Sequence, residues 1–186
     1  MTFWSNLIGY QAVWFAAVIG ASHGKAWPGL AACGLFVSWQ VLAAEQPMVE
    51  LRLLAVAVVL GVLIDGVLAR YDWVSYATPH PALSTHGAPA WILVLWASFS
   101  LTLNRSLAYL KTRLWLALLL GAVGAPLAYL GAQHGWRSVV FQPPSWRGIA
   151  WIAFSWAIAL PLLALLARRW SVAALSSASL VHKGES

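Results

Sequence analysis

The sequence predicts an all-α fold, a polytopic transmembrane helical bundle of about six helices with both termini cytoplasmic. Of the 186 residues, 61% are hydrophobic and 9% are charged, and the mean hydropathy is +0.76. A soluble domain carries about a quarter charged residues, so this chain cannot cover itself with a polar surface. The length corresponds to one domain, and helices of about 20 apolar residues each leave room for six spans.

Six apolar runs support this prediction. The expected helices cover residues 3–21, 28–44, 51–69, 90–110, 114–133 and 148–169. They form a single transmembrane domain over 1–170, and the small and polar residues 171–186 predict a flexible C-terminal tail. Two separators, ATPHPALSTHGAP and FQPPSW, are rich in proline, which favours extended or turn backbone and therefore surface loops. Since nothing basic precedes the first run, we expect its helix to be retained rather than cleaved as a signal peptide.

The basic residues indicate how the helices are oriented. With six spans both termini share a side, and that side carries seven of the eleven Lys and Arg residues: Arg52, Arg105, Lys111, Arg113, Arg168, Arg169 and Lys183. Cytoplasmic segments carry the excess of positive charge, so the termini are expected in the cytoplasm and the two long loops outside. Because the basic residues are scattered at the ends of apolar runs, the net charge of +6 indicates topology and not nucleic-acid binding.

The thirteen tryptophans fall into two groups. Nine lie near the ends of the expected helices, where amphipathic rings prefer the membrane interface: Trp4, Trp27, Trp73, Trp91, Trp115, Trp136, Trp146, Trp151 and Trp170. The other four lie deeper, where an indole N–H needs a partner: Trp14, Trp39, Trp96 and Trp156. The first group predicts an aromatic belt. The second group either packs inside the bundle, which is the commoner role, or lines a ligand cavity.

Asp65 is the only acid within an apolar run and is the first candidate for function. Residues four apart share a helix face, and Asp65 shares its face with Ala57, Gly61 and Ala69. Small residues allow close helix packing in lipid, so Asp65 is expected to face the bundle. At about 1.5 Å per residue, Asp65 and Tyr129 lie at the same level, about 20 Å from the cytoplasmic face. This pair is the candidate catalytic or hydrogen-bonding pair, because burying an acid in a membrane is costly; the alternative is a structural role for Asp65.

A second set of residues forms the predicted ligand-binding group. Trp96 and the glycine faces of the third and fifth expected helices would form walls, and Pro126 frees a backbone carbonyl that needs another donor. Asn104 falls in the cytoplasmic third, at the level of Gln11 and Asn6, in a separate inner tier. The candidate ligand-binding residues are Trp96, Ser100, Asn104, Gln11, Asn6, Gly121 and Pro126.

No motif predicts a metal or a cofactor. Asp72, His80, His86 and His134 gather near the outer loops and could form a metal or acid/base site, but they lack the helical spacing that makes a metal motif specific. Cys33 stands alone in an apolar run, which predicts a small buried residue and neither a disulfide nor a thiolate site. The Walker, GxSxG, HExxH and CxxC sequences are absent as well, so no cofactor is expected.

Three stretches carry a family resemblance: NLIGYQAVWF, LWASFSLTLNRSLAYL and GAVGAPLAYLGAQHG. Together with Asp65 they resemble an uncharacterised family of small bacterial inner-membrane proteins, domain of unknown function family two-eight-seven-eight, over most of the chain up to residue 135. The family pattern matches Asn6, Gln11, Trp14, Asp65, Trp96, Thr102, Leu103, Ser106, Leu107, Tyr109, Gly121, Gly124, Pro126, Tyr129 and Gly131.

Two features depart from that pattern. Trp often stands where this chain has Tyr109, and the loop 71–89 is longer here, which leaves its histidines outside the resemblance. The resemblance implies a multi-pass protein of the bacterial inner membrane. It also implies a link to lipid metabolism, because family members often lie near genes for fatty-acid-modifying methyltransferases; this is an association and not a mechanism.

The leading hypothesis is a bundle that binds or modifies a lipid or another apolar small molecule, with Asp65 and Tyr129 as the acid/base or hydrogen-bonding pair. Its partners would be membrane lipids, an apolar ligand and lipid-modifying enzymes, without nucleic acid. The alternative is a non-enzymatic scaffold that assembles a lipid-modifying complex through its small-residue faces. A proton-coupled transporter would also use an intramembrane acid, but the sequence shows no paired half-repeats or matched broken helices. The residues leave open whether the protein is an enzyme.

Overall fold

The part of the chain that the structure describes consists of helices, their connecting loops and one two-stranded sheet. The computed structural model describes residues 2–184. Its helices are α1 (Phe3–Ser22), α2 (Trp27–Leu42), α3 (Pro47–Arg70), α4 (Ala90–Ser100), α5 (Leu114–Leu119), α6 (Ala125–Trp136) and α7 (Trp146–Gly184), with a 3-10 helix η1 (Ala108–Thr112) and a π-helical segment η2 (Leu120–Gly124). Strands β1 (Val74–Tyr76) and β2 (Val139–Phe141) pair antiparallel. The predicted all-α class is confirmed.

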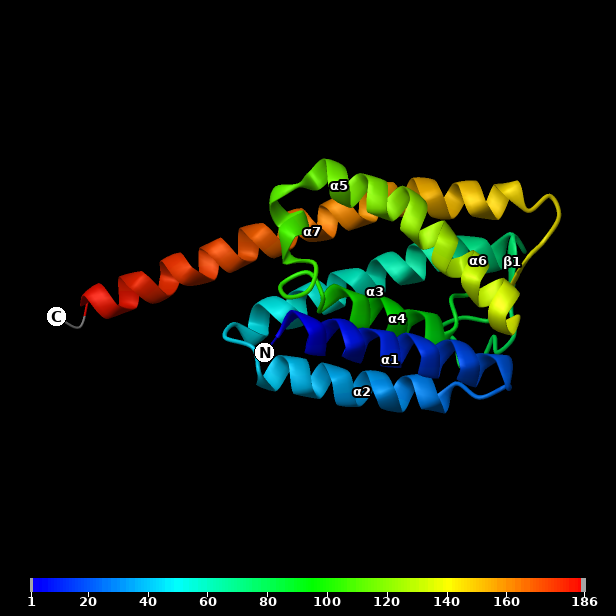
Figure 1. The fold of residues 1–186 in the computed structure, drawn as a ribbon, viewed down its shortest axis with the longest axis horizontal. Helices are drawn as coiled ribbons and strands as arrows, with labels where there is room; N and C mark the ends of the chain where they lie inside the picture. Colours follow the sequence, from blue (N-terminus) through cyan, green and yellow to red (C-terminus); the bar gives the residue numbers. More distant parts are fainter. Residues whose placement is uncertain (1, 185–186) are drawn as a thin grey trace.

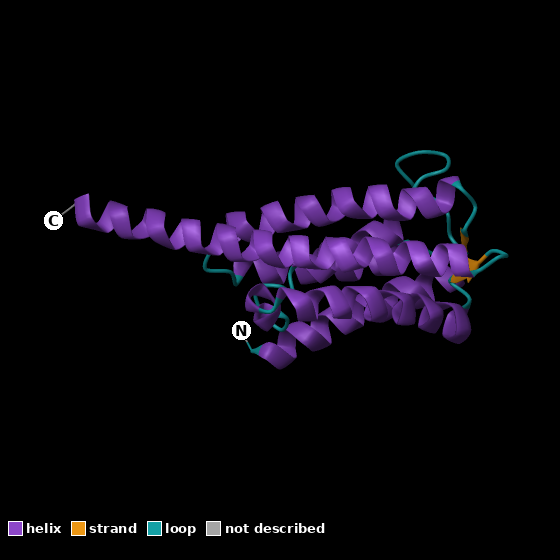
Figure 2. Ribbon diagram, turned by 90° about the horizontal axis from the view of Figure 1, so that it is seen from above, coloured by secondary structure: helices purple, strands orange, loops and turns teal. Residues whose placement is uncertain are grey.

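The helices lie side by side along one axis, and the chain begins and ends at the same end of the bundle (Figure 1). α1 packs against α2 and α4, α3 packs against α4 and α7, and α7 also packs against α5 and η2. The two strands and the long loops lie at the opposite end (Figure 2). We call this the loop end of the bundle.

Within the described residues, three helical segments are long and apolar enough to cross a membrane: Pro47–Arg70, Leu114–Trp136 and Trp146–Ala174. Helices α2 and α4 are apolar but shorter. Large apolar side chains such as Leu35 and Leu42 are exposed on the outside of the bundle, and extended apolar surface of this kind marks a contact with lipid or with another protein. These are the features of a membrane protein.

The last helix extends beyond its expected end. α7 continues through Gly184, whereas the sequence predicted an end at residue 169 and a tail over 171–186. The flexibility of that tail stays a prediction, and residues 185 and 186 lie outside the described part of the chain.

The prediction of one helix over 90–110 is wrong in its second half. α4 ends at Ser100, turns follow, and η1 begins at Ala108. At this point side-chain hydroxyls compete with backbone N–H groups for the backbone carbonyls. Ser100 and Thr102 each donate to the carbonyl three residues earlier, at 2.7 and 2.6 Å. Side chains that bond to the local backbone weaken the case for continuing a helix.

Asn6 of α1 compensates for the break after α4. Its Nδ2 donates to the Leu101 carbonyl at 3.2 Å, and its Oδ1 accepts from the backbone N–H and the hydroxyl of Ser106 at 3.3 and 2.6 Å. Non-helical backbone inside a membrane protein must be satisfied by other protein groups. Asn6, which is fully buried, is therefore a structural support for this segment.

A π-helical turn connects α5 to α6 immediately before Pro126. Pro126 has no N–H and so cannot continue the regular hydrogen-bond ladder. Within the turn, a Cβ on Gly121 would collide with the carbonyl oxygen of Trp156, so the glycine allows the backbone of η2 to lie directly against α7. The small-residue face predicted for this helix is thus a helix-packing face.

The two long loops hold each other together at the loop end. β1 comes from the first loop and β2 from the second, a pairing that three-residue strands are too short to reveal in the sequence. Thr78 donates to the Ala21 carbonyl at 2.7 Å, and Trp91 donates to the Thr78 carbonyl at 2.9 Å. Trp91 was expected in the aromatic belt, but it is only 1% exposed and belongs to the core.

Candidate functional site

Asp65 lies fully buried at the centre of a hydrogen-bond network. Tyr76 of β1 donates to Oδ1 of Asp65 at 3.0 Å, Tyr129 of α6 donates to the same oxygen, and Trp96 of α4 donates from Nε1 to Oδ2 at 2.8 Å. Three donors from three different elements thus converge on one carboxyl group of α3. The structure brings together Asp65 and Tyr129, which were expected at one level of the bundle.

Trp96 reaches Asp65 because Gly61 leaves room for its ring. A Cβ on Gly61 would lie 2.5 Å from Cδ1 of Trp96, closer than real atoms approach. Gly61 and Asp65 lie four residues apart and share a face of α3, and Ala57 on the same face is also buried. The small-residue stripe therefore gives the indole access to the carboxyl group.

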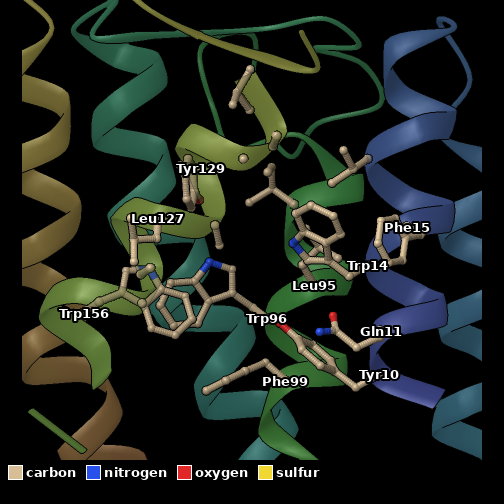
Figure 3. Close-up of a pocket in the computed structure, with 18 of the residues that line it drawn as sticks. Tyr10, Gln11, Trp14, Phe15, Leu95, Trp96, Phe99, Leu127, Tyr129 and Trp156 are labelled. Atoms are coloured by element: carbon tan, nitrogen blue, oxygen red, sulfur yellow. The ribbon is translucent and has the colours of Figure 1, made fainter. Parts of the chain in front are cut away.

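Trp96 and Tyr129 also form part of the wall of a cavity of about 530 Å³. The cavity lies between α1 and α4 on one side and η2, α6 and α7 on the other (Figure 3). Ligand sites typically measure about 300–1,000 Å³ and are mostly apolar. This cavity fits that description, with Trp14, Trp96 and Trp156 contributed by three different helices.

The cavity opens at the surface between α1 and α6. Phe15 of α1 and Leu127 of α6 both line it, and they are 44% and 60% exposed. Towards the loop end, Trp136 of α6 meets the rings of Trp14 and Phe15 edge-on, with centroids 5.7 and 5.6 Å apart. These aromatic contacts close one end of the gap between α1 and α6.

No Asp, Glu, Lys, Arg or His side chain is among the lining residues in the described part of the chain. Asp65 is absent from the lining because Tyr129 and Trp96 stand between it and the cavity. The Tyr129 hydroxyl donates a hydrogen bond to Asp65, so its oxygen can still accept a hydrogen bond from another group. Asp65 is therefore connected to the cavity wall through these two side chains.

Two other polar groups belong to the cavity wall. The amide of Gln11 points from α1 toward the cavity (Figure 3). The indole of Trp156 stacks on that of Trp96, with ring centroids 4.1 Å apart. The Nε1 of Trp156 is buried and has no hydrogen-bond partner within residues 2–184. A buried donor without an acceptor is unfavourable, so this N–H is the most unusual group in the wall.

The predicted ligand-binding residues divide in the structure. Trp96 and Gln11 line the cavity, whereas five others lie outside its lining: Ser100, Asn104, Asn6, Gly121 and Pro126. Three of the four deep tryptophans line it, whereas Trp39 is 45% exposed elsewhere on the surface.

Asn104 belongs to a second polar cluster, around the start of α3. Lys111 donates to Oδ1 of Asn104 at 3.0 Å, and Glu50 lies buried beside both. Burial lowers the pKa of Lys111 below its ordinary value of 10.5. The sequence places Asn104 in a separate tier from Asp65, but it gives no hint of Glu50, since EQPMVE looks like a connection and α3 begins earlier, at Pro47.

Tyr76 is the site residue that sequence reasoning missed, whereas Trp156 was expected only as one of four deep tryptophans that either pack or line a cavity. Tyr76 lies in a loop, and its only signal is the short alternation VSY after an apolar helix. The unpartnered N–H of Trp156 depends on its neighbours in space and leaves no trace in the sequence.

Within residues 2–184, no group of three or more His, Cys, Asp or Glu side chains is arranged to hold a metal ion. Cys33 is buried and carries a free thiol.

No curated protein and no solved structure matches this chain. A family model does match, over residues 3–162, and its description is "Protein of unknown function (DUF2878)". The matched range contains Asp65, its three donors and every residue that lines the cavity, and it confirms the family resemblance carried by the three sequence stretches. Because the match covers most of the chain, this protein belongs to that family of proteins of unknown function.

Proposed function

We propose that this is an integral membrane protein that binds an apolar or amphipathic molecule, taken from the membrane, in the cavity between α1, α4, α6 and α7. The observation that carries the proposal is the cavity itself, about 530 Å³ in volume and lined mainly by aromatic and aliphatic side chains. Its rim residues Phe15 and Leu127 are exposed. In a bundle surrounded by lipid, an opening between two helices faces acyl chains, so an apolar molecule enters sideways without crossing water.

Tyr129 and Trp96 would contact the bound molecule, whereas Asp65 would act through them. Asp65 fixes the direction of both donors, which keeps the two side chains in one orientation as parts of the cavity wall. It is therefore a positioning residue in this proposal. Any chemistry on the ligand would involve Tyr129, the member of the pair that lines the cavity.

The proposed topology has six passes through the bacterial inner membrane, with both termini cytoplasmic. Two observations support it: the chain begins and ends at one end of the bundle (Figure 1), and three helical segments have the required length and composition. The 11 residues of α4 measure about 17 Å at 1.5 Å per residue, so the turns that follow α4 would complete that pass. Reporter fusions at the C-terminus and in the loop 71–89 test this, and a C-terminus outside the cell would overturn it.

Ligand binding can be tested on protein extracted from its own membrane in polymer-bounded lipid discs. Mass spectrometry of the extracted small molecules should find one apolar species enriched over the bulk lipid. Ala128 lines the cavity, whereas Ala31 is exposed on α2 and does not. Ala128→Trp should therefore lower the enrichment at least tenfold, and Ala31→Trp should leave it unchanged.

The absence of any enriched molecule, or an Ala128→Trp variant that retains it in full, would contradict the proposal. The first result would favour the scaffold alternative, which needs apolar surfaces but no occupied cavity.

A further inference from the structure

We infer that the ligand of this cavity is electrically neutral and carries a hydroxyl or carbonyl oxygen next to its hydrocarbon part, as a long-chain alcohol or an acylglycerol does. The inference rests on the proposed function and adds the chemical class of the ligand. It follows from which polar residues line the cavity and from the hydrogen-bonding capacity that each of them leaves unused.

Charge is the first criterion. The lining, all of it within the described residues, contains no ionisable acid or base other than tyrosine. A charged head group buried there would have no counter-ion, and burying an unpaired charge is far more costly than burying a neutral polar group. The nearest acid, Asp65, is already engaged by Tyr76, Trp96 and Tyr129. The cavity therefore disfavours both carboxylate and ammonium ligands.

The unpartnered indole N–H is the second criterion. Trp156 lines the cavity, yet its Nε1 is buried and finds no acceptor in the described protein. Its ring is held by the stack on Trp96, and in Figure 3 both indole nitrogens point toward the end of the cavity where Tyr129 lies. A ligand oxygen placed there accepts the free N–H and recovers the hydrogen bond that the protein lacks.

The remaining polar groups suit a neutral oxygen as well. The Tyr129 oxygen can accept a hydrogen bond while its O–H donates to Asp65, and the Gln11 amide both donates and accepts. A hydroxyl group can thus accept from Trp156 and donate to Tyr129 or Gln11. A bare hydrocarbon would fill the same volume but would leave the Trp156 N–H unpaired.

Three probes of equal chain length separate these possibilities: hexadecanol, hexadecanoic acid and hexadecane. Their binding to the full-length protein in lipid discs can be measured by native mass spectrometry at an alkaline pH, where the acid is ionised. Hexadecanol should bind roughly 3- to 10-fold more tightly than hexadecane, the effect of one net hydrogen bond. It should bind at least tenfold more tightly than the ionised acid.

Variants of the wall test the assigned groups. Trp156→Phe keeps an aromatic ring but removes the N–H, so it should weaken hexadecanol roughly 3- to 10-fold and leave hexadecane unchanged. Gln11 is exposed, so Gln11→Leu offers a second test that does not disturb the core. This variant should also weaken the binding of hexadecanol. Trp39→Phe, outside the cavity, is the matched control and should change neither ligand.

Each outcome decides between the two proposals. An acid or an alkane that binds as tightly as the alcohol overturns the neutral-oxygen inference and leaves the proposed cavity function standing. A Trp156→Phe variant that weakens alcohol and alkane equally shows that the N–H takes no part in recognition, which also overturns it. Failure of all three probes to bind counts against the proposed function itself.

Discussion

The substitution Asp65→Leu tests whether one buried carboxyl holds the loop end of the bundle together. It leaves the hydroxyls of Tyr76 and Tyr129 and the indole N–H of Trp96 without their acceptor, at a position that is 0% exposed. Polar contacts between helices in membrane proteins contribute about 0.6 kcal/mol on average and at most about 1.7 kcal/mol. Three such contacts therefore place the expected loss at about 2–5 kcal/mol of unfolding free energy.

Asp65→Asn is the matched variant, because it keeps one acceptor. Its carbonyl oxygen can still accept from both tyrosines, whereas its NH₂ group faces the Trp96 N–H, so one contact of three is lost. The expected cost is about 0.6–1.7 kcal/mol. Tyr76→Phe and Tyr129→Phe each remove one donor and should fall in the same range.

The assay is reversible unfolding in bicelles, followed by the fluorescence of the tryptophans. The expected order of stability is wild type, then Asp65→Asn with the two Phe variants, then Asp65→Leu. A Leu variant within about 0.6 kcal/mol of wild type would refute the idea that the carboxyl group stabilises the fold. An Asn variant as unstable as the Leu variant would show that charge, and not the number of acceptors, governs the site.

Three further outcomes are expected from the same structure. Gly61→Ala should lower the free energy of unfolding by about 1–3 kcal/mol, because the new Cβ clashes with the Trp96 ring. Gly66→Ala is its control: the Cβ there meets nothing within 4 Å, so the unfolding free energy should stay the same or rise by up to about 1 kcal/mol. Equal effects of the two variants in the unfolding assay would contradict the packing argument. Asn6→Ala should raise amide hydrogen exchange in the segment after α4, and unchanged exchange there would show that the break needs no support. Burial lowers the pKa of Lys111 below 10.5 in the folded protein, so the unfolded chain binds more protons just below that pH and the free energy of unfolding rises with pH there. Lys111→Met should flatten this part of the curve of unfolding free energy against pH. An unaltered slope would argue against the lowered pKa.

The common level of Asp65 and Tyr129 could be predicted because it follows from helix geometry. A fixed rise per residue sets depth, and a spacing of four residues sets the shared face. Both quantities hold within an unbroken helix such as α3, where Gly61 and Asp65 face inward as expected.

Features that depend on distant parts of the chain could not be predicted. The end of α4 at Ser100 is stabilised by Asn6, which lies 95 residues before its partner Leu101. Tyr76 reaches Asp65 only because β1 pairs with a strand from another loop. Hydropathy and periodicity describe one segment at a time, so they overextended the helix and left the tyrosine in a featureless loop.

The π-helical turn at Leu120–Gly124 determines where this span can gain or lose a residue. A π turn holds one more residue than the corresponding α-helical turn, and it absorbs that residue without rotating the helix on either side. A relative one residue shorter here, with an unbroken α-helix, would still present Tyr129 to Asp65. A residue gained or lost elsewhere between η2 and Tyr129 would rotate the tyrosine by about 100° and turn its hydroxyl away from the carboxyl group, so this turn is where the span tolerates a change in length at least cost.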